Sequence, residues 1–206
     1  MSRTRRSIAE DSERRTALLD AAQELMLEEG YAAVTTRRLT AKVGVNSALV
    51  YYYFDTMDGL FIELFRRSAD RTYARQEEAL ASPQPLWALW ELIHDPAGTA
   101  LTMEFAALAN HRKAIRSEIA ASARRFRMLQ LERLTAVLEG YGLADKHLPP
   151  ISVILMLSGL SRFLLMEEAF DLDIGHAETI AVIERFIRDC EGERVRDDAT
   201  AEPHRV

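Results

Sequence analysis

The segment TTRRLTAKVGVNSALVYYYF, residues 35–54, decides the fold of this chain. Thr35 or Thr36 can cap a first short helix, because a hydroxyl accepts a hydrogen bond from a backbone N–H that lacks a partner inside the helix. Gly44 can end that helix, since glycine adopts the left-handed conformation at low cost, and Asn46 is a strong cap for a second helix. Two short helices joined by a turn that contains glycine predict a helix-turn-helix.

The apolar residues of these two helices indicate which side faces a core. Leu39 and Val43 lie four residues apart on the first helix, and Val45 is the apolar residue of the turn. On the second helix the residues expected to point inward are Val50, Tyr51 and Phe54. The residues expected to face outward are Ser47, Ala48, Leu49, Tyr52 and Tyr53.

The wider segment from Arg14 to Leu64 resembles the DNA-binding domain of the TetR family of transcriptional regulators. RRTALLDAAQELMLEEGY (14–31) matches the first helix of that domain, residues 35–54 match its second and third helices, and MDGLFIELF (57–65) matches the start of the fourth. The resemblance covers roughly a quarter of the chain. It implies an all-α fold, in which an N-terminal three-helix head carries the helix-turn-helix and a larger C-terminal helical domain serves ligand binding and dimerisation.

The resemblance also implies roles in DNA binding for individual residues. Thr36 stands at a phosphate-binding position, and Arg37 stands where some family members place an arginine on a guanine edge. The base-reading positions are Ser47, Ala48 and Leu49, and the phenols at phosphate-contacting positions are those of Tyr52 and Tyr53. The alternative for the three consecutive tyrosines is ordinary packing of a small domain.

Two positions depart from the family pattern. Many members have a phosphate-binding lysine where Met57 stands, and Asp55 and Asp58 flank that position in this chain. Ala48 replaces a common glycine, which a helix accommodates easily. We expect these changes to affect the affinity for DNA and not the fold.

The composition is that of a helical protein with a sizeable core. The chain has 206 residues, of which 48% are hydrophobic, and it contains only 9 glycines and 6 prolines. The single cysteine, Cys190, excludes an internal disulfide and is typical of a reducing cytoplasm. The N-terminus has no signal-peptide pattern, and the apolar run 151–166 is short and interrupted by polar residues. We therefore expect a cytoplasmic protein that does not enter a membrane.

The net charge of −6 is unevenly distributed. Residues 1–75 contain 12 Lys and Arg and 11 Asp and Glu, whereas residues 76–206 contain 14 and 21. Contacts with DNA must therefore come from local patches in the first part. Arg3, Arg5 and Arg6 form either a basic arm that reaches DNA or a solvated tail.

Helical periodicity and breakers divide the chain into four parts. We expect a flexible basic arm (1–11), a helix-turn-helix domain (12–57), an effector-binding and dimerisation domain (58–190) and a disordered tail (191–206). The further helices are expected at about 12–29, 57–81, 85–94, 99–110, 112–139, 150–170 and 176–190. No segment shows the alternating pattern of a strand.

The expected helix at 150–170 is apolar nearly all round, so both of its sides must be covered. The resemblance implies a homodimer in which residues 150–190 form a four-helix bundle with the same residues of a second copy. A central helix buried within a monomer is the alternative.

Bulky aromatic residues and methionines are frequent in the part after the head. Each alone is consistent with ordinary core, but flexible thioethers suit an irregular cavity, and the group predicts a pocket for an apolar or amphipathic effector that weakens DNA binding. The residues of this predicted pocket are Trp87, Trp90, Met103, Phe105, Phe126, Met128, Met156 and Phe163.

No pattern in the sequence indicates catalysis. The five histidines are scattered, and the sequence has neither metal-ligand spacing, nor a nucleophile elbow, nor a phosphate-binding glycine loop. We therefore expect no enzyme, no metal and no cofactor, but a ligand-responsive repressor that binds a palindromic operator. Two rival functions stay open: a helical carrier or enzyme that kept only the architecture of the head, and a DNA-binding protein without a ligand.

Overall fold

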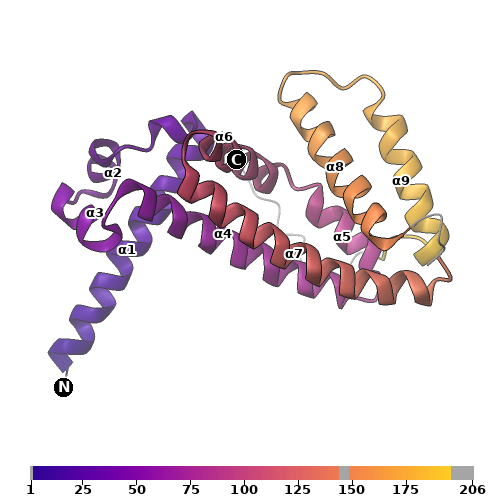
Figure 1. The fold of residues 1–206 in the computed structure, drawn as a ribbon, viewed down its shortest axis with the longest axis horizontal. Helices are drawn as coiled ribbons and strands as arrows, with labels where there is room; N and C mark the ends of the chain where they lie inside the picture. The colour runs from indigo at the N-terminus through magenta and orange to yellow at the C-terminus, as the bar shows by residue number, and fades with distance from the viewer. Residues whose placement is uncertain (1, 144–148, 196–206) are drawn as a thin grey trace. The chain divides into compact units, whose positions relative to one another are not determined.

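The computed structural model describes residues 2–143 and 149–195, which form nine α-helices, one short 3-10 helix and no strand (Figure 1). The elements are α1 (Ser2–Glu29), η1 (Tyr31–Ala33), α2 (Thr36–Val43), α3 (Ser47–Phe54), α4 (Met57–Leu80), α5 (Pro85–Ile93), α6 (Pro96–His111), α7 (Lys113–Gly140), α8 (Pro150–Glu168) and α9 (His176–Glu191). The prediction of an all-α fold is confirmed.

The first helix is longer than the sequence pattern indicated. It begins at Ser2 and not at the expected Ser12, so it includes nearly all of the segment predicted to be a flexible arm. No proline or glycine occurs between Ser2 and Glu29, and these are the residues that interrupt helices most strongly. The helix ends at Gly30, which has a φ of 83° and donates its N–H to the carbonyl of Met26 at 3.1 Å.

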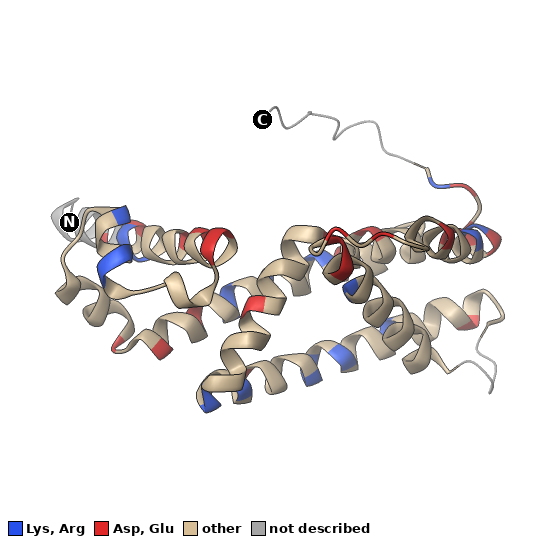
Figure 2. Cartoon of the chain, turned by 90° about the horizontal axis from the view of Figure 1, so that it is seen from above, with Lys and Arg blue, Asp and Glu red and all other residues tan. Residues whose placement is uncertain are grey.

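The described helices group into two compact units. The first unit contains the chain up to Ala74 together with Asp95–Leu129, and the second contains Arg75–His94 together with the chain from Gln130 onward. Lys and Arg and also Asp and Glu are scattered over the helices of both units, between longer stretches of other residues (Figure 2).

The core of the first unit unites the helix-turn-helix with a helix that is distant in sequence. Apolar residues of α1 pack with the inward residues of α2 and α3 and with the start of α4, and α6 adds three large side chains to the same cluster. Those three are Leu101, Phe105 and Leu108. Phe105 packs edge-on against Phe65 of α4, with 5.2 Å between the ring centroids. The head is therefore completed by α6 and does not consist of α1 to α3 alone.

Charged groups fasten α6 and α7 within this unit. The Glu104 carboxylate of α6 accepts a hydrogen bond from the backbone N–H of Tyr31 at 2.7 Å, just after α1 ends. Arg66 of α4 forms a two-pronged ion pair with Glu118 of α7, at 2.8 and 2.9 Å. This hydrogen-bonded pair lowers the pKa of Glu118 below its ordinary value. The polar contacts thus orient the helices that the apolar cluster holds together.

The core of the second unit is built from α5, α8 and α9, with the ends of α4 and α7. By length and composition α8 could cross a membrane, but the core helix of a soluble protein has the same properties. Val153, Ile154, Leu157, Leu164 and Leu165 of α8 are buried in the protein. We therefore interpret α8 as a core helix.

Candidate DNA-binding site

The two helices of the helix-turn-helix begin and end as their sequence predicts. Thr35 caps α2, because its hydroxyl accepts a hydrogen bond from the N–H of Arg38 at 3.4 Å. Gly44 ends α2 in the left-handed conformation, with a φ of 75°. Asn46 caps α3 by accepting from the N–H of Leu49 at 3.0 Å. These caps fix the direction in which α3 leaves the turn.

The outward face of α3 is formed by Ser47, Ala48 and Tyr52. All three are exposed, and Tyr52 is 70% exposed. Val50 and Phe54 are buried, as predicted, but the prediction that Tyr51 points inward is wrong, since it is 48% exposed. The Tyr51 hydroxyl instead lies 3.2 Å from Oγ1 of Thr36, in an exposed contact between α3 and α2.

Tyr53 and Thr36 already have partners within the protein. The Tyr53 hydroxyl donates to the Asp11 carboxylate of α1 at 3.0 Å, and burial, followed by this hydrogen bond, raises the pKa of Tyr53. The Thr36 hydroxyl lies 3.4 Å from the sulfur of Met57. Arg37, by contrast, is exposed. Tyr53 therefore joins α3 to α1.

The acidic residues around Met57 are not equivalent. Asp58, in the first turn of α4, forms an ion pair with Arg112 at the end of α6. The guanidinium of Arg112 also lies 5.6 Å from the centroid of the Phe61 ring. Asp55 is exposed and ends α3 with a φ of 57°. The ion pair of Asp58 could not be predicted from the neighbouring sequence, because its partner Arg112 lies 54 residues further along the chain.

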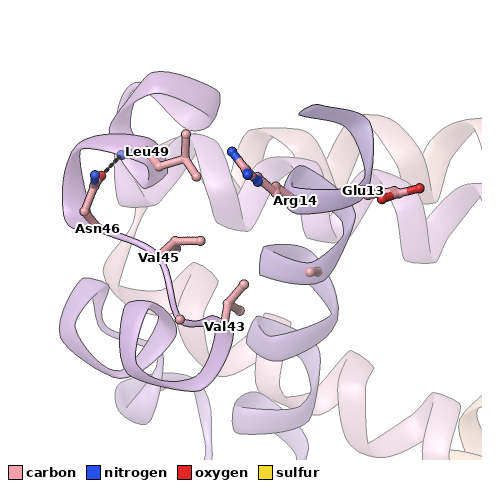
Figure 3. A pocket seen from close by; sticks show the side chains of 8 residues that line it. Glu13, Arg14, Val43, Val45, Asn46 and Leu49 are labelled. Atoms are coloured by element: carbon pink, nitrogen blue, oxygen red, sulfur yellow. Dashed lines mark hydrogen bonds between the residues drawn. The ribbon is translucent and has the colours of Figure 1, made fainter. Parts of the chain in front are cut away.

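A groove of about 570 Å³ lies between α1 and the turn that joins α2 to α3 (Figure 3). The apolar side chains of Ala17, Val43, Val45 and Leu49 line it, and Arg14 lies at its rim. Leu49, predicted to read bases, is only partly exposed and lies in this groove. The groove could not be predicted from the residues of the helix-turn-helix alone, because α1 supplies one of its walls.

The residues predicted to form an effector pocket are distributed over both units. Phe105 belongs to the core of the first unit, and Trp87 and Trp90 belong to the core of the second. Phe126 is partly buried and packs against Tyr73, with 6.1 Å between the ring centroids. The exposed members are Met103, Met128, Met156 and Phe163.

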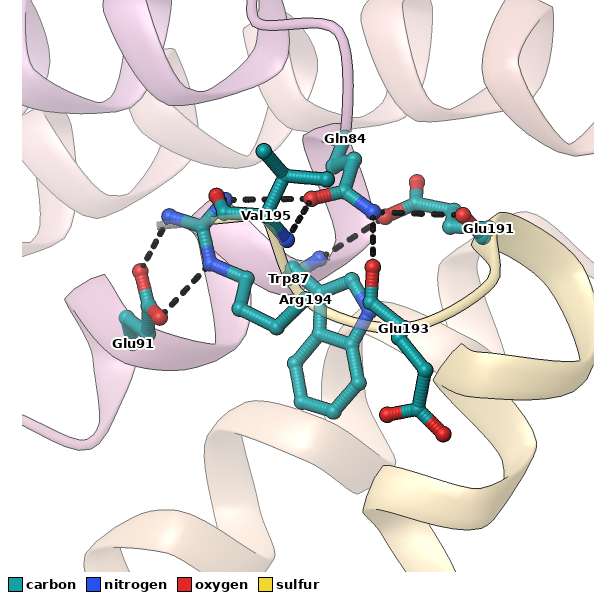
Figure 4. A network of polar contacts seen from close by, with 7 residues as sticks. All are labelled: Gln84, Trp87, Glu91, Glu191, Glu193, Arg194 and Val195. Atoms are coloured by element: carbon teal, nitrogen blue, oxygen red, sulfur yellow. Dashed lines mark hydrogen bonds and ion pairs between the residues drawn. The ribbon is translucent and has the colours of Figure 1, made fainter. Parts of the chain in front are cut away.

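Trp87 lies against the segment that the sequence predicts to be the start of a disordered tail (Figure 4). Its indole N–H donates to the carbonyl of Gly192 at 3.0 Å. The Glu191 carboxylate accepts from the N–H groups of Leu86 and Trp87, at 2.8 and 3.1 Å, and from the hydroxyl of Tyr141 at 2.8 Å. Desolvation by burial, followed by the contact with Glu191, raises the pKa of Tyr141 to about 12.

Residues beyond α9 continue along the same surface of α5. Arg194 pairs with Glu91 through two hydrogen bonds of 2.8 Å, and the N–H of Val195 donates to the Gln84 side chain at 2.8 Å. The remainder of the predicted tail, 196–206, lies outside the described residues. Trp87 is therefore held in the structure by the C-terminal segment.

The fold and this site define a helix-turn-helix DNA-binding regulator. Two capped helices meet at a fixed corner, and the second presents an exposed face of small and aromatic side chains. This is the arrangement with which a recognition helix enters the major groove.

Comparisons with known proteins agree with this class. The family model described as "Bacterial regulatory proteins, tetR family" matches residues 18–64. The HTH-type transcriptional repressor KstR2 of Rhodococcus jostii is 28% identical over 109 residues, which are 53% of each chain, so the match spans about half the length of that repressor.

Solved structures show the same fold over most of the chain. A putative TetR-family transcriptional regulator from a Rhodococcus species superposes with a TM-score of 0.69 at 18% identity, covering 85% of this chain and 99% of that one. The ketosteroid regulator KstR2 of Mycobacterium tuberculosis gives 0.55 at 23%, covering 74% and 82%. The family match at residues 18–64, the relatives and the fold together support a TetR-family transcriptional regulator. These relatives are named as transcriptional regulators, which agrees with the prediction that this chain is not an enzyme.

The contact between Tyr53 and Asp11 makes Tyr53 and Tyr52 experimentally separable. Tyr53→Phe removes a partly buried hydrogen bond, so we expect it to lower the free energy of unfolding by about 0.5–1.5 kcal/mol. Tyr52→Phe should leave this free energy unchanged, because the Tyr52 side chain is largely exposed. Urea unfolding followed by circular dichroism measures both variants. Equal stability of the two would contradict the role of Tyr53 as a link between α1 and α3.

Proposed function

We propose that the chain is a repressor that binds a palindromic operator in duplex DNA as a homodimer and that a small molecule releases it. The observation that carries the proposal is the exposed face of α3, whose helix is fixed by the Asn46 cap and by the buried Val50 and Phe54. An α-helix fits the major groove of B-DNA, where each base pair presents a distinct pattern of hydrogen-bonding groups. A repressor must be in the same compartment as the DNA that it binds, so the proposal includes a cytoplasmic location.

The exposed side chains support separate roles at the operator. Ser47 can donate to or accept from a base edge, and the Ala48 methyl group can contact a thymine methyl. Tyr52 is placed to donate its hydroxyl to a phosphate, and Arg37 can donate two hydrogen bonds to a guanine. Tyr53 is left out of the proposed contacts because its hydroxyl is bound to Asp11.

The proposed role of Arg37 can be tested with DNA from the region upstream of the gene. Arg37→Ala should weaken binding of that duplex by about 1–3 kcal/mol and relax the preference at one base position. Fluorescence anisotropy with duplexes substituted one base pair at a time measures both effects. Arg38→Ala is the matched control, because Arg38 is already paired with Glu29 and its loss should change the affinity little. Equal losses for every duplex would make Arg37 a phosphate contact, and failure of the wild-type chain to prefer any duplex would contradict the proposed function.

The second unit carries an exposed apolar face that supports a dimer. On α8, Leu155, Met156 and Phe163 are each about half exposed, at 50%, 51% and 50%, and Val182 of α9 is 63% exposed. Large apolar side chains left exposed on two helices of one unit are typical of an interface. A second copy of the same two helices would complete a four-helix bundle.

Phe163 tests the proposed interface better than a buried residue of the same helix. Phe163→Glu should shift the chain from dimer to monomer in size-exclusion chromatography with light scattering, because a carboxylate would be buried without a partner. Leu157 is unsuitable, since it is buried within its own unit and a charge there would disrupt the fold. Leu27→Glu, at an exposed leucine of α1, is the control and should leave the dimer intact. A full dimer of the folded Phe163→Glu variant would show that the interface lies elsewhere.

The interior of the second unit supports an effector with a polar group on an apolar body. The Gln76 side chain is 1% exposed, and its Oε1 has no hydrogen-bond partner among the described residues. A buried acceptor without a partner costs about 1–3 kcal/mol, which a donor group of a bound molecule would recover. One relative of the same fold is named as a ketosteroid regulator, and another was solved in complex with choline.

A hydroxylated steroid and choline can test the effector proposal. Titration with sodium cholate should raise the melting temperature and weaken operator binding, and Gln76→Leu should reduce both effects; choline chloride is tested in parallel. A hundredfold preference for the conformation that does not bind DNA corresponds to about 2.7 kcal/mol per site. A compound that raises the melting temperature but leaves the operator affinity unchanged would support a pocket and contradict the switch.

A further inference from the structure

The basic residues near the helix-turn-helix differ in whether they have an acidic partner. Residues 11–54 contain five Lys and Arg. Three of these have partners: Arg15 pairs with Glu63, Arg38 with Glu29 and Lys42 with Glu24. Within the part of the chain that the structure describes, the other two, Arg14 and Arg37, make no ion pair. Two cations of this region are therefore available to a ligand with negative charge.

Arg14 lies at the groove between α1 and the turn of the helix-turn-helix. Figure 3 shows its side chain reaching from α1 toward Leu49 of α3, while the Glu13 carboxylate points the other way. Arg14 is exposed, so its guanidinium is accessible to a ligand. The groove thus combines one exposed cation with apolar walls that include Val43 and Val45.

We propose that this groove seats the sugar-phosphate backbone of the operator and that Arg14 pairs with a phosphate there. The inference rests on the proposed function, since it requires α3 to bind DNA. The first turn of α3 carries Ser47, Ala48 and Leu49. Ser47 and Ala48 are the proposed base-reading residues, and Leu49 lines the groove. A DNA strand whose bases contact this end of α3 therefore passes beside the groove.

The chemistry of the groove suits a DNA backbone. A guanidinium matches the geometry of a phosphate and donates two parallel hydrogen bonds to it, and half or more of protein–DNA hydrogen bonds go to phosphate and sugar. The apolar walls can contact the deoxyribose, which carries no charge. Arg14 would therefore position the chain on the duplex without reading its sequence.

The experiment measures operator binding by fluorescence anisotropy at several salt concentrations between about 50 and 200 mM KCl. Arg14→Ala should weaken binding about tenfold for the operator and for single-base variants alike. The slope of log K against log salt should fall by about one, because one fewer phosphate is neutralised. Arg14→Lys should keep the wild-type slope, and the control Arg15→Ala, which removes a cation already paired with Glu63, should keep it as well.

Three results would overturn the assignment. An Arg14→Ala chain with wild-type affinity and slope would show that the groove does not contact the backbone. A loss confined to one base position would make Arg14 a base-reading residue. Failure of the wild-type chain to bind any duplex would overturn the proposed function and this assignment with it. Melting curves of each variant, followed by circular dichroism, establish that any loss of binding occurs in a folded chain.

Discussion

The corner between α2 and α3 is the constraint on which the rest of the head depends. Gly44 takes a left-handed conformation that other residues adopt only at a cost, and Asn46 then caps the next helix within two residues. This corner fixes which residues of α3 enter the core and which face outward. Val50 and Phe54 are buried, whereas Ser47, Ala48 and Tyr52 are exposed. The geometry of this one turn therefore decides which face of α3 is exposed.

A second feature of the head is its dependence on α6. This helix comes 42 residues after α3 in the sequence, yet its Leu101, Phe105 and Leu108 lie in the same apolar cluster as α1 to α4. The Glu104 carboxylate of α6 accepts a hydrogen bond from the backbone N–H of Tyr31. Arg112, at the end of α6, forms an ion pair with Asp58. A displacement of α6 would therefore break its contacts with Tyr31 and with Asp58. This gives a physical route by which an event outside the helix-turn-helix could alter the position of α3.

The local features of the fold were predictable from sequence because their causes are local. Caps, glycines and helical periodicity act over a few residues, and the bounds of α2 to α9 follow from them closely. The wrong prediction that Tyr51 points inward shows the limit of helical periodicity as a guide. In a helix of eight residues, a shift of the pattern by one position changes which side chains are predicted to be buried.

Contacts between distant residues could not be predicted in the same way. The Tyr53 hydroxyl donates to Asp11, which lies 42 residues earlier, and the backbone N–H of Tyr31 donates to Glu104, which lies 73 residues later. The charge of the segment 191–195 predicts a disordered tail, yet the Glu191 carboxylate accepts a hydrogen bond from the N–H of Leu86 in the first turn of α5, 105 residues earlier in the chain. In the site, exposure of Ser47, Ala48 and Tyr52 agrees with the expected outward face, but their contacts with bases and phosphates stay predictions until DNA is bound.

The central claim is that the outer face of α3 reads a DNA sequence in two symmetric copies. Selection of bound duplexes from a random library, run in parallel with the wild-type chain and Ser47→Ala, tests it most directly. We expect the wild type to enrich a two-fold symmetric sequence whose half-site centres lie about one helical turn, roughly 34–36 Å, apart or slightly more. We also expect Ser47→Ala to relax the same position in both half-sites. Absence of any enriched sequence, or an enriched sequence without symmetry, would contradict the account.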